Sequence, residues 1–117
     1  MKLIIAGSRT LEASVEELCE LLGRFNLMPT EIVSGTAKGI DRCGEVLAKT
    51  VGLDIKRFPA DWETHGKSAG YKRNGQMAGY ADALLLIWDG QSKGSGHMKD
   101  IMTRKNKPVY EIIIKKP

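Results

Sequence analysis

The sequence predicts an α/β protein, a single-domain Rossmann-like three-layer sandwich with a mainly parallel five-stranded sheet. Short apolar runs alternate along the chain with longer stretches in which apolar residues recur every three or four positions. Parallel strands need long crossover connections, and amphipathic helices between the apolar runs supply them. The chain has 117 residues, of which 42% are hydrophobic. That is enough to bury one core, so we expect residues 1–117 to form one domain.

Five short segments are predicted as strands. Residues 3–6 and 83–88 are continuous apolar runs, typical of strands that are covered on both faces. Residues 54–58 alternate between polar and apolar side chains, which favours a half-exposed or edge strand. The predicted strands are, in chain order, residues 3–6, 32–33, 54–58, 83–88 and 109–114.

Four helical segments separate these strands. The first has apolar residues at helical spacing from Leu11 to Phe25, and we expect Thr10 to cap it. The second begins after the small residues that follow residue 33 and ends near Gly52. After the third strand we expect a loop to about residue 67 and a glycine-interrupted helix over residues 68–80. The last helix is predicted over residues 97–105, and the tail over 115–117 is expected to be solvated.

The composition favours a mildly basic protein of a reducing compartment. A formal net charge of +4 favours anionic partners such as nucleotides or nucleic acid, without a histone-like excess of cations. Cys19 and Cys43 have neither metal nor disulfide spacing, so we expect two small core residues. No apolar run is long enough for a signal peptide or a membrane span. We therefore expect a cytoplasmic protein with no membrane partner, no metal and no cofactor.

Four loops follow the first four predicted strands directly. They cover residues 7–9, 34–36, 59–62 and 89–92, and three of them are rich in glycine and serine. The carboxyl ends of parallel strands lie on one edge of a sheet, and ligands bind there in open α/β sheets. The sequence therefore predicts a ligand site formed by these loops.

The stretch from Ser34 to Asp41 is predicted to hold a phosphate. Small residues lead there from a strand into a helix, whose first backbone amides lack intrahelical partners and carry the positive end of the helix dipole. Gly35 and Gly39 allow a ligand to approach the backbone closely. Asp41 either bonds a ribose hydroxyl or only favours the helix dipole.

The stretch from Gly90 to Gly96 is a second glycine- and serine-rich loop. The two loops together suit a phosphate and a sugar, although neither matches a Walker A or a G-x-G-x-x-G motif. Residues 90–94 match G-x-S-x-G, but His97 precedes Asp100, the reverse of the usual order in α/β hydrolases. We therefore interpret Ser92 as a hydroxyl donor to a ligand.

Four side chains near these loops have two interpretations each. Arg9 follows a strand and either forks onto a phosphate or lies on the surface. Arg73 and Asn74 face either the cleft or water. Trp62 either stacks on a base or covers the open end of the core.

Four motifs together point to a family. They are Gly7-Ser8-Arg9, residues 33–41, Arg73-Asn74 with Met77, and Trp88-Asp89-Gly90 with Ser92, Gly94 and Ser95. In order and spacing, over nearly the whole chain, they resemble the YspA/YpsA-related branch of the SLOG superfamily. The resemblance implies a Rossmann-like fold and a nucleotide-type ligand, with ADP-ribose and NAD derivatives among the candidates. The superfamily includes LOG phosphoribohydrolases and single-strand-binding DNA-processing A (Smf) proteins.

One departure from the LOG enzymes concerns catalysis. Their P-G-G-x-G-T-x-x-E loop ends in a glutamate that helps to cleave an N-glycosidic bond, and no glutamate follows Ser95 at that place here. Cleavage needs an anion beside the oxocarbenium-like centre and an acid for the leaving base. Asp61 and Asp89 are the catalytic candidates that we retain, with Asp100 as a further substitute.

The leading hypothesis is binding of a nucleotide or nucleotide derivative such as AMP, ADP-ribose or an NAD-like molecule, for sensing or processing. The first alternative is a nucleotide N-glycosidic hydrolase. The second is a single-stranded nucleic-acid-binding module that uses Lys67, Lys72 and Arg73 with stacking on Trp62 or Tyr71. The oligomeric state is left open, although SLOG relatives often form dimers or larger assemblies. The predicted ligand-binding residues are Gly7, Ser8, Arg9, Ser34, Gly35, Thr36, Gly39, Asp41, Arg73, Asn74, Asp89, Gly90, Ser92, Gly94 and Ser95.

Overall fold

Five parallel strands in the order β3-β2-β1-β4-β5 form the central sheet of the computed structural model. The structure describes residues 1–115, so Lys116 and Pro117 of the expected solvated tail lie outside the described residues. The strands are β1 (Lys2–Gly7), β2 (Glu31–Ser34), β3 (Asp54–Arg57), β4 (Ala83–Trp88) and β5 (Val109–Ile113). The helices are α1 (Val15–Arg24), α2 (Ile40–Val51), α3 (Trp62–His65), the 3-10 turn η1 (Gly66–Ser68), α4 (Ala69–Tyr80) and α5 (Lys93–Arg104).

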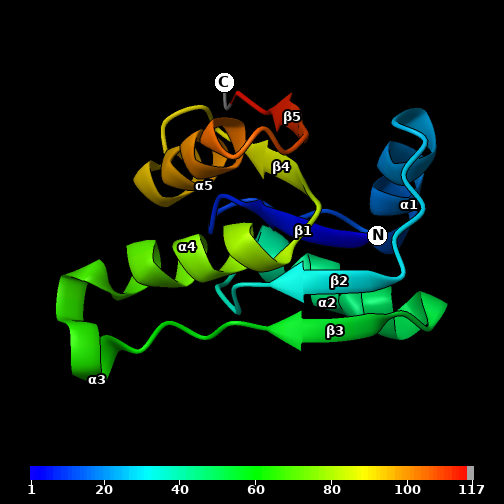
Figure 1. Cartoon of the computed structure of the whole chain (residues 1–117). Helices are drawn as coiled ribbons and strands as arrows, with labels where there is room; N and C mark the ends of the chain where they lie inside the picture. Colours follow the sequence, from blue (N-terminus) through cyan, green and yellow to red (C-terminus); the bar gives the residue numbers. More distant parts are fainter. Residues whose placement is uncertain (116–117) are drawn as a thin grey trace.

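Helices cover both faces of this sheet (Figure 1), and a hydrophobic core lies on each face. Successive side chains of a strand point to opposite faces, so Leu3 and Ile5 of β1 pack with α1 and α2, whereas Ile4 packs with α4 and α5. All six residues of β4 are buried, as expected for a strand covered on both sides. The predicted α/β sandwich with a five-stranded parallel sheet is confirmed, including the edge position of β3.

Three helix starts differ from the sequence prediction. Helix α1 begins at Val15, because Ser14 and Glu17 form a complete capping box; Thr10 is not its cap. The expected loop over residues 60–67 contains the short helix α3, which Asp61 caps by accepting from the Thr64 amide at 3.1 Å. Helix α5 begins at Lys93, four residues earlier than expected.

The prediction that both cysteines are core residues was wrong for Cys19, which is exposed, and Cys43 is only half-buried. None of the helices within residues 1–115 is both long and apolar enough to cross a bilayer. Within the same residues, no three His, Cys, Asp or Glu side chains cluster in a way that would hold a metal ion.

Helix α4 is anchored at its carboxyl end by a side chain from the α5–β5 connection. The Lys107 Nζ donates to the carbonyl oxygens of Ala78 at 2.6 Å and Ala81 at 2.7 Å. A cation at this end also suits the helix dipole. The bonds fix one end of α4, whose polar side chains reach the site described next.

Candidate functional site

A cavity of about 340 Å³ opens at the carboxyl edge of the sheet, between β1 and β4. These two strands are neighbours in the sheet, yet β1 leads to α1 on one face and β4 leads to α5 on the other. Such a switch point is where open α/β sheets place their ligands. The volume lies at the small end of the range of about 300–1,000 Å³ that ligand pockets span.

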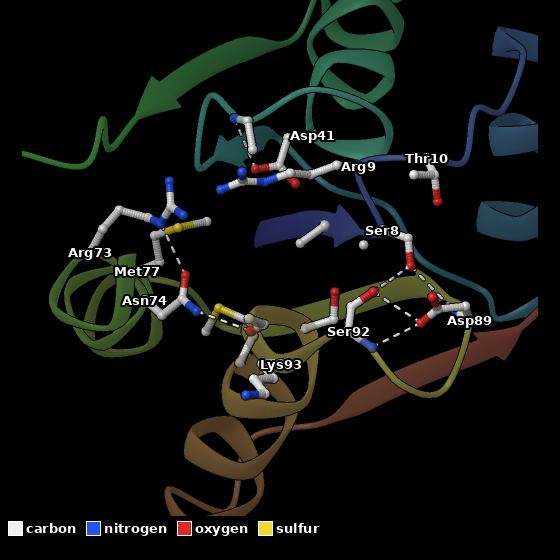
Figure 2. A pocket seen from close by; sticks show the side chains of 16 residues that line it. Ser8, Arg9, Thr10, Asp41, Arg73, Asn74, Met77, Asp89, Ser92 and Lys93 are labelled. Atoms are coloured by element: carbon white, nitrogen blue, oxygen red, sulfur yellow. Dashed lines mark hydrogen bonds between the residues drawn. The ribbon is translucent and has the colours of Figure 1, made fainter. Parts of the chain in front are cut away.

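Ten of the fifteen residues predicted for ligand binding line this cavity, as Figure 2 shows for most of them. They are Gly7, Ser8, Arg9, Asp41, Arg73, Asn74, Asp89, Ser92, Gly94 and Ser95. Thr10, Lys93, Met77 and Met98 also line it, although none of them was among the predicted ligand-binding residues. Met77 and Met98 also belong to the hydrophobic core on this face of the sheet, and apolar spacing alone gives no signal that a core residue also faces a cavity.

The cavity's wall beside β4 is built by Ser8, Asp89 and Ser92. The buried Ser8 hydroxyl accepts from the Asp89 amide at 3.1 Å and shares a hydrogen bond with the Ser92 hydroxyl at 3.1 Å. The Asp89 Oδ1 accepts from the backbone amides of Gln91 and Ser92 and from the Ser92 hydroxyl, each at 2.9 Å. These bonds lower the pKa of Asp89 to about 2. Asp89 therefore organises the loop as a carboxylate and carries no proton to donate at neutral pH.

The first turn of α5 faces the same cavity. Lys93, Gly94 and Ser95 line it, and Ser95 is buried. The Ser92 side chain makes no cap bond to this helix within residues 1–115. A twelve-residue helix thus presents amide donors and the positive end of its dipole to the cavity. This end of α5 is suited to an anion.

The β2–α2 loop is arranged differently, because protein groups occupy the start of α2. The Asp41 Oδ2 accepts from the Ala37 amide at 3.3 Å, and the Arg73 Nη1 donates to the Gly35 carbonyl oxygen. Burial raises the pKa of Asp41 to about 6, although the Ala37 amide and the Arg73 charge oppose this rise. Here the carboxylate of Asp41 already takes the place in which the sequence analysis expected a phosphate.

Four predicted ligand-binding residues of this stretch lie outside the cavity, namely Ser34, Gly35, Thr36 and Gly39. Ser34 is fully buried, donates to the Glu45 Oε2 at 2.7 Å and accepts from the Thr36 amide. Gly35 and Thr36 line a neighbouring groove, and Gly39 lines another between α1 and α2. Gly90, with φ of 84°, forms a turn beside Ile113 and lines none of these hollows.

Consecutive residues of α4 connect the two loops. Arg73 reaches Gly35, and its Nε donates to the Asn74 Oδ1 at 3.0 Å. The Asn74 amide nitrogen donates to the Gly94 carbonyl oxygen at 3.1 Å and lies 3.3 Å from the His97 Nδ1. Both side chains therefore face the cleft, which resolves the alternative that the sequence left open (Figure 2).

His97 supports this arrangement, although the sequence analysis gave it no site role. Its ring lies edge-on to Tyr71 with 4.6 Å between ring centroids. Burial lowers its pKa, so the imidazole is neutral at pH 7 and its Nδ1 accepts from the Asn74 amide.

A second hollow of about 580 Å³, the Trp62 groove, adjoins the cavity. Arg9 and Arg73 line both hollows, and Trp62, 52% exposed, lines only the groove. Trp62 therefore does not seal the end of the core. Asp61, one of the two catalytic candidates, caps α3 and lines neither hollow.

No family model and no curated protein matches the chain. Among solved structures, the chain is similar to DNA processing protein A (DprA) from Streptococcus pneumoniae, with a TM-score of 0.74 and 20% sequence identity. The two chains share a fold. The similarity covers 97% of this chain and 50% of the DNA processing protein, so this chain spans about half the length of that protein. At this identity the comparison shows the Rossmann-like architecture and leaves the YspA-related branch as part of the proposal below.

Proposed function

We propose that the protein binds a nucleotide or nucleotide derivative through a phosphate at the first turn of α5, as a sensor or processing domain of the YspA-related type. The observation that carries the proposal is the open amino end of α5 in a cavity at the switch point of the sheet. A phosphate there meets backbone amides and the helix dipole.

Side chains around the cavity supply the remaining donors. The Ser95 hydroxyl lies in the first turn of α5, and Arg9 and Arg73 bring two guanidinium groups to the opposite side. Guanidinium groups bind phosphate with paired, charge-assisted hydrogen bonds. The cavity by itself has room for one nucleotide unit, so AMP is the simplest ligand with which to test the phosphate site.

The test is calorimetric titration of the protein with AMP. In the Arg9→Ala variant, the free energy of binding should weaken by about 1.5–3 kcal/mol, or about ten- to 150-fold in Kd, because charged hydrogen bonds to the phosphate are lost. The matched control is Arg24→Ala, since Arg24 is an exposed arginine of α1 that pairs with Glu20. Absence of AMP binding by the unmodified protein, or equal affinity in both variants, contradicts the proposal.

Hydrolysis of the bound nucleotide is a second candidate, and one observation favours it. The buried carboxyl of Asp41 lines the cavity, and its pKa of about 6 allows proton transfer near neutral pH. A proton NMR time course with AMP distinguishes the two functions. An unchanged anomeric signal over hours indicates binding alone, whereas its loss with release of free adenine indicates hydrolysis.

Single-stranded nucleic acid is a third candidate, because the structural neighbour is a DNA processing protein. Arg9, Lys38, Arg42 and the exposed Trp62 line the groove beside the cavity. Binding of an oligonucleotide through several phosphates should weaken steeply with salt, which fluorescence anisotropy between 50 and 200 mM salt measures. A flat response contradicts this candidate.

A further inference from the structure

The Trp62 groove is unusually rich in positive charge. Its lining includes Arg9, Lys38, Arg42 and Arg73, and none of the described residues that line it is acidic. Among residues 1–115, Arg9, Lys38 and Arg42 take part in no salt bridge. A concave surface with several cations and no carboxylate in its lining suits an anionic group of a ligand.

Two of these cations are shared with the cavity. Arg9 and Arg73 line both the cavity and the groove, so one pair of guanidinium groups borders both hollows. Burial lowers the pKa of Arg73, the charge of Asp41 opposes this shift, and the charge of Arg9 adds a smaller lowering. The two guanidinium groups therefore lie close enough for one anion to meet both.

The exposed face of Trp62 adds an aromatic surface to the same groove. Helix α3 has no buried residue, and Asp61 and Thr64 hold its first turn by a hydrogen bond of 3.1 Å. The indole is therefore held beside the cations without serving the core. An aromatic ring next to phosphate-binding cations suits a nucleobase or another planar ring.

We propose that the Trp62 groove is a second subsite of the nucleotide site, so that the ligand is a nucleotide carrying a pyrophosphate, as in a nucleoside diphosphate or a dinucleotide. This inference rests on the proposed phosphate site at α5. The first phosphate lies at α5, the second lies between the shared arginines and Arg42, and any group beyond it extends toward Trp62.

The shared arginines favour a pyrophosphate over a nucleic-acid strand. The two phosphates of a pyrophosphate are joined through one bridging oxygen, so one guanidinium pair can contact both. Successive phosphates of a strand are separated by a whole sugar. The sizes agree with this assignment, because the cavity of about 340 Å³ has room for one nucleotide unit and the adjoining groove of about 580 Å³ takes the remainder.

The test compares AMP, ADP and ADP-ribose by calorimetric titration of the full chain. In the unmodified protein, ADP and ADP-ribose should bind at least about tenfold more tightly than AMP, because the second phosphate gains charged hydrogen bonds. Arg42→Gln should bring the ratio of ADP to AMP affinity toward one, since Arg42 lines the groove and not the cavity. Arg24→Gln, which removes the same charge from α1, should leave the ratio unchanged.

Two further measurements separate the outcomes. Binding of ADP-ribose should quench the fluorescence of Trp62, and Trp62→Phe should remove that signal while the buried Trp88 stays in place. AMP binding with equal affinities for AMP, ADP and ADP-ribose overturns the second subsite and leaves the phosphate site standing. Failure of all three ligands overturns the proposed function itself. Tighter binding of a 5′-phosphorylated single-stranded oligonucleotide than of ADP-ribose assigns the groove to nucleic acid and overturns the pyrophosphate.

Discussion

The strand–helix turns after β2 and β4 both contain glycine and hydroxyl side chains, but they differ in structure. In the β2–α2 loop, the Asp41 carboxylate and the Arg73 guanidinium fill the space over Gly35. In the first turn of α5, a methyl group added to Gly94 would meet no atom within 4 Å among the described residues. Glycine serves close packing in the first loop and leaves an open surface in the second. The difference teaches that a glycine- and serine-rich strand–helix turn is available to a ligand only where the protein's own groups leave the helix end free.

The largest expected effect on stability comes from adding a methyl group to the filled β2–α2 loop. Gly39 has φ of 76°, and a Cβ there would lie 2.8 Å from the Arg9 Cα and closer still to the Ser8 carbonyl oxygen. Gly39→Ala should therefore destabilise the fold by about 3 kcal/mol or more, from backbone strain and from the clash. Urea unfolding of the variant and the unmodified protein measures this decrease in the free energy of unfolding.

Gly52→Ala is the matched control, because Gly52 has φ of 80° and open space around its Cβ position. This substitution should lower the free energy of unfolding only by the backbone strain, about 1 kcal/mol. Equal losses in the two variants would show that packing against Ser8 and Arg9 contributes nothing.

The carboxylate that fills the β2–α2 loop gives a pH-dependent prediction. Burial raises the pKa of Asp41 from 3.8 to about 6, so the folded state binds a proton more readily than the unfolded chain between these values. The stabilisation is present in full below about pH 4 and is lost as the pH rises through 6. Asp41→Asn should therefore be more stable than the unmodified protein by about 2–3 kcal/mol at pH 7.5, with no difference at pH 4.

Urea unfolding from pH 4 to 7.5 tests this, with Asp54→Asn at an exposed position as the charge control. A lower stability of Asp41→Asn at pH 7.5 would mean that attraction to Arg73 outweighs the burial of the charge.

The same variant also tests the role of Asp41 toward a ligand. Phosphate affinity rises if Asp41 only repels the anion, and nucleotide affinity falls if Asp41 bonds a ribose hydroxyl.

The smallest expected effect comes from the open loop. Gly94→Ala should stabilise α5 by about 0.5 kcal/mol, because alanine favours a helix over glycine. It should also weaken AMP binding, because the methyl group enters the turn that lines the cavity. Gly23→Ala in α1, where a Cβ also meets open space, should give the same stabilisation without changing AMP affinity. Equal AMP affinity in the two variants would remove this turn from the ligand site.

The five strands of the sheet could be predicted from the sequence because the patterns that indicate a strand are local. The fully apolar run of β4 and the alternation in β3 each predict burial from a few neighbouring residues. The first residues of the helices were harder to predict than the strands. The Ser14–Glu17 capping box was present in the sequence and was overlooked, whereas the start of α5 at Lys93 was not readable, because glycine at positions 94 and 96 favours a loop and tertiary contacts override that preference.

The distinction between the filled and the open loop was not readable either. It depends on Arg73, which lies 38 residues from Gly35 along the chain and reaches its carbonyl oxygen only in the folded state. It depends equally on the Asp41 carboxylate, which accepts a hydrogen bond from the Ala37 amide. Residue types at a loop predict which chemistry is available there, and only the packing decides which groups are already occupied.

The adjacency of Arg73 and Asn74 also has a mechanical consequence. Consecutive helical residues project about 100° apart around the axis, and here one holds the β2–α2 loop while the other holds the first turn of α5. A rotation of α4 about its axis would strain one attachment while slackening the other, and Lys107 restrains the far end of the helix. Helix α4 therefore holds the two sides of the cleft at a fixed separation. We therefore expect the cleft to be preformed, so that the proposed ligand would bind without a closing movement.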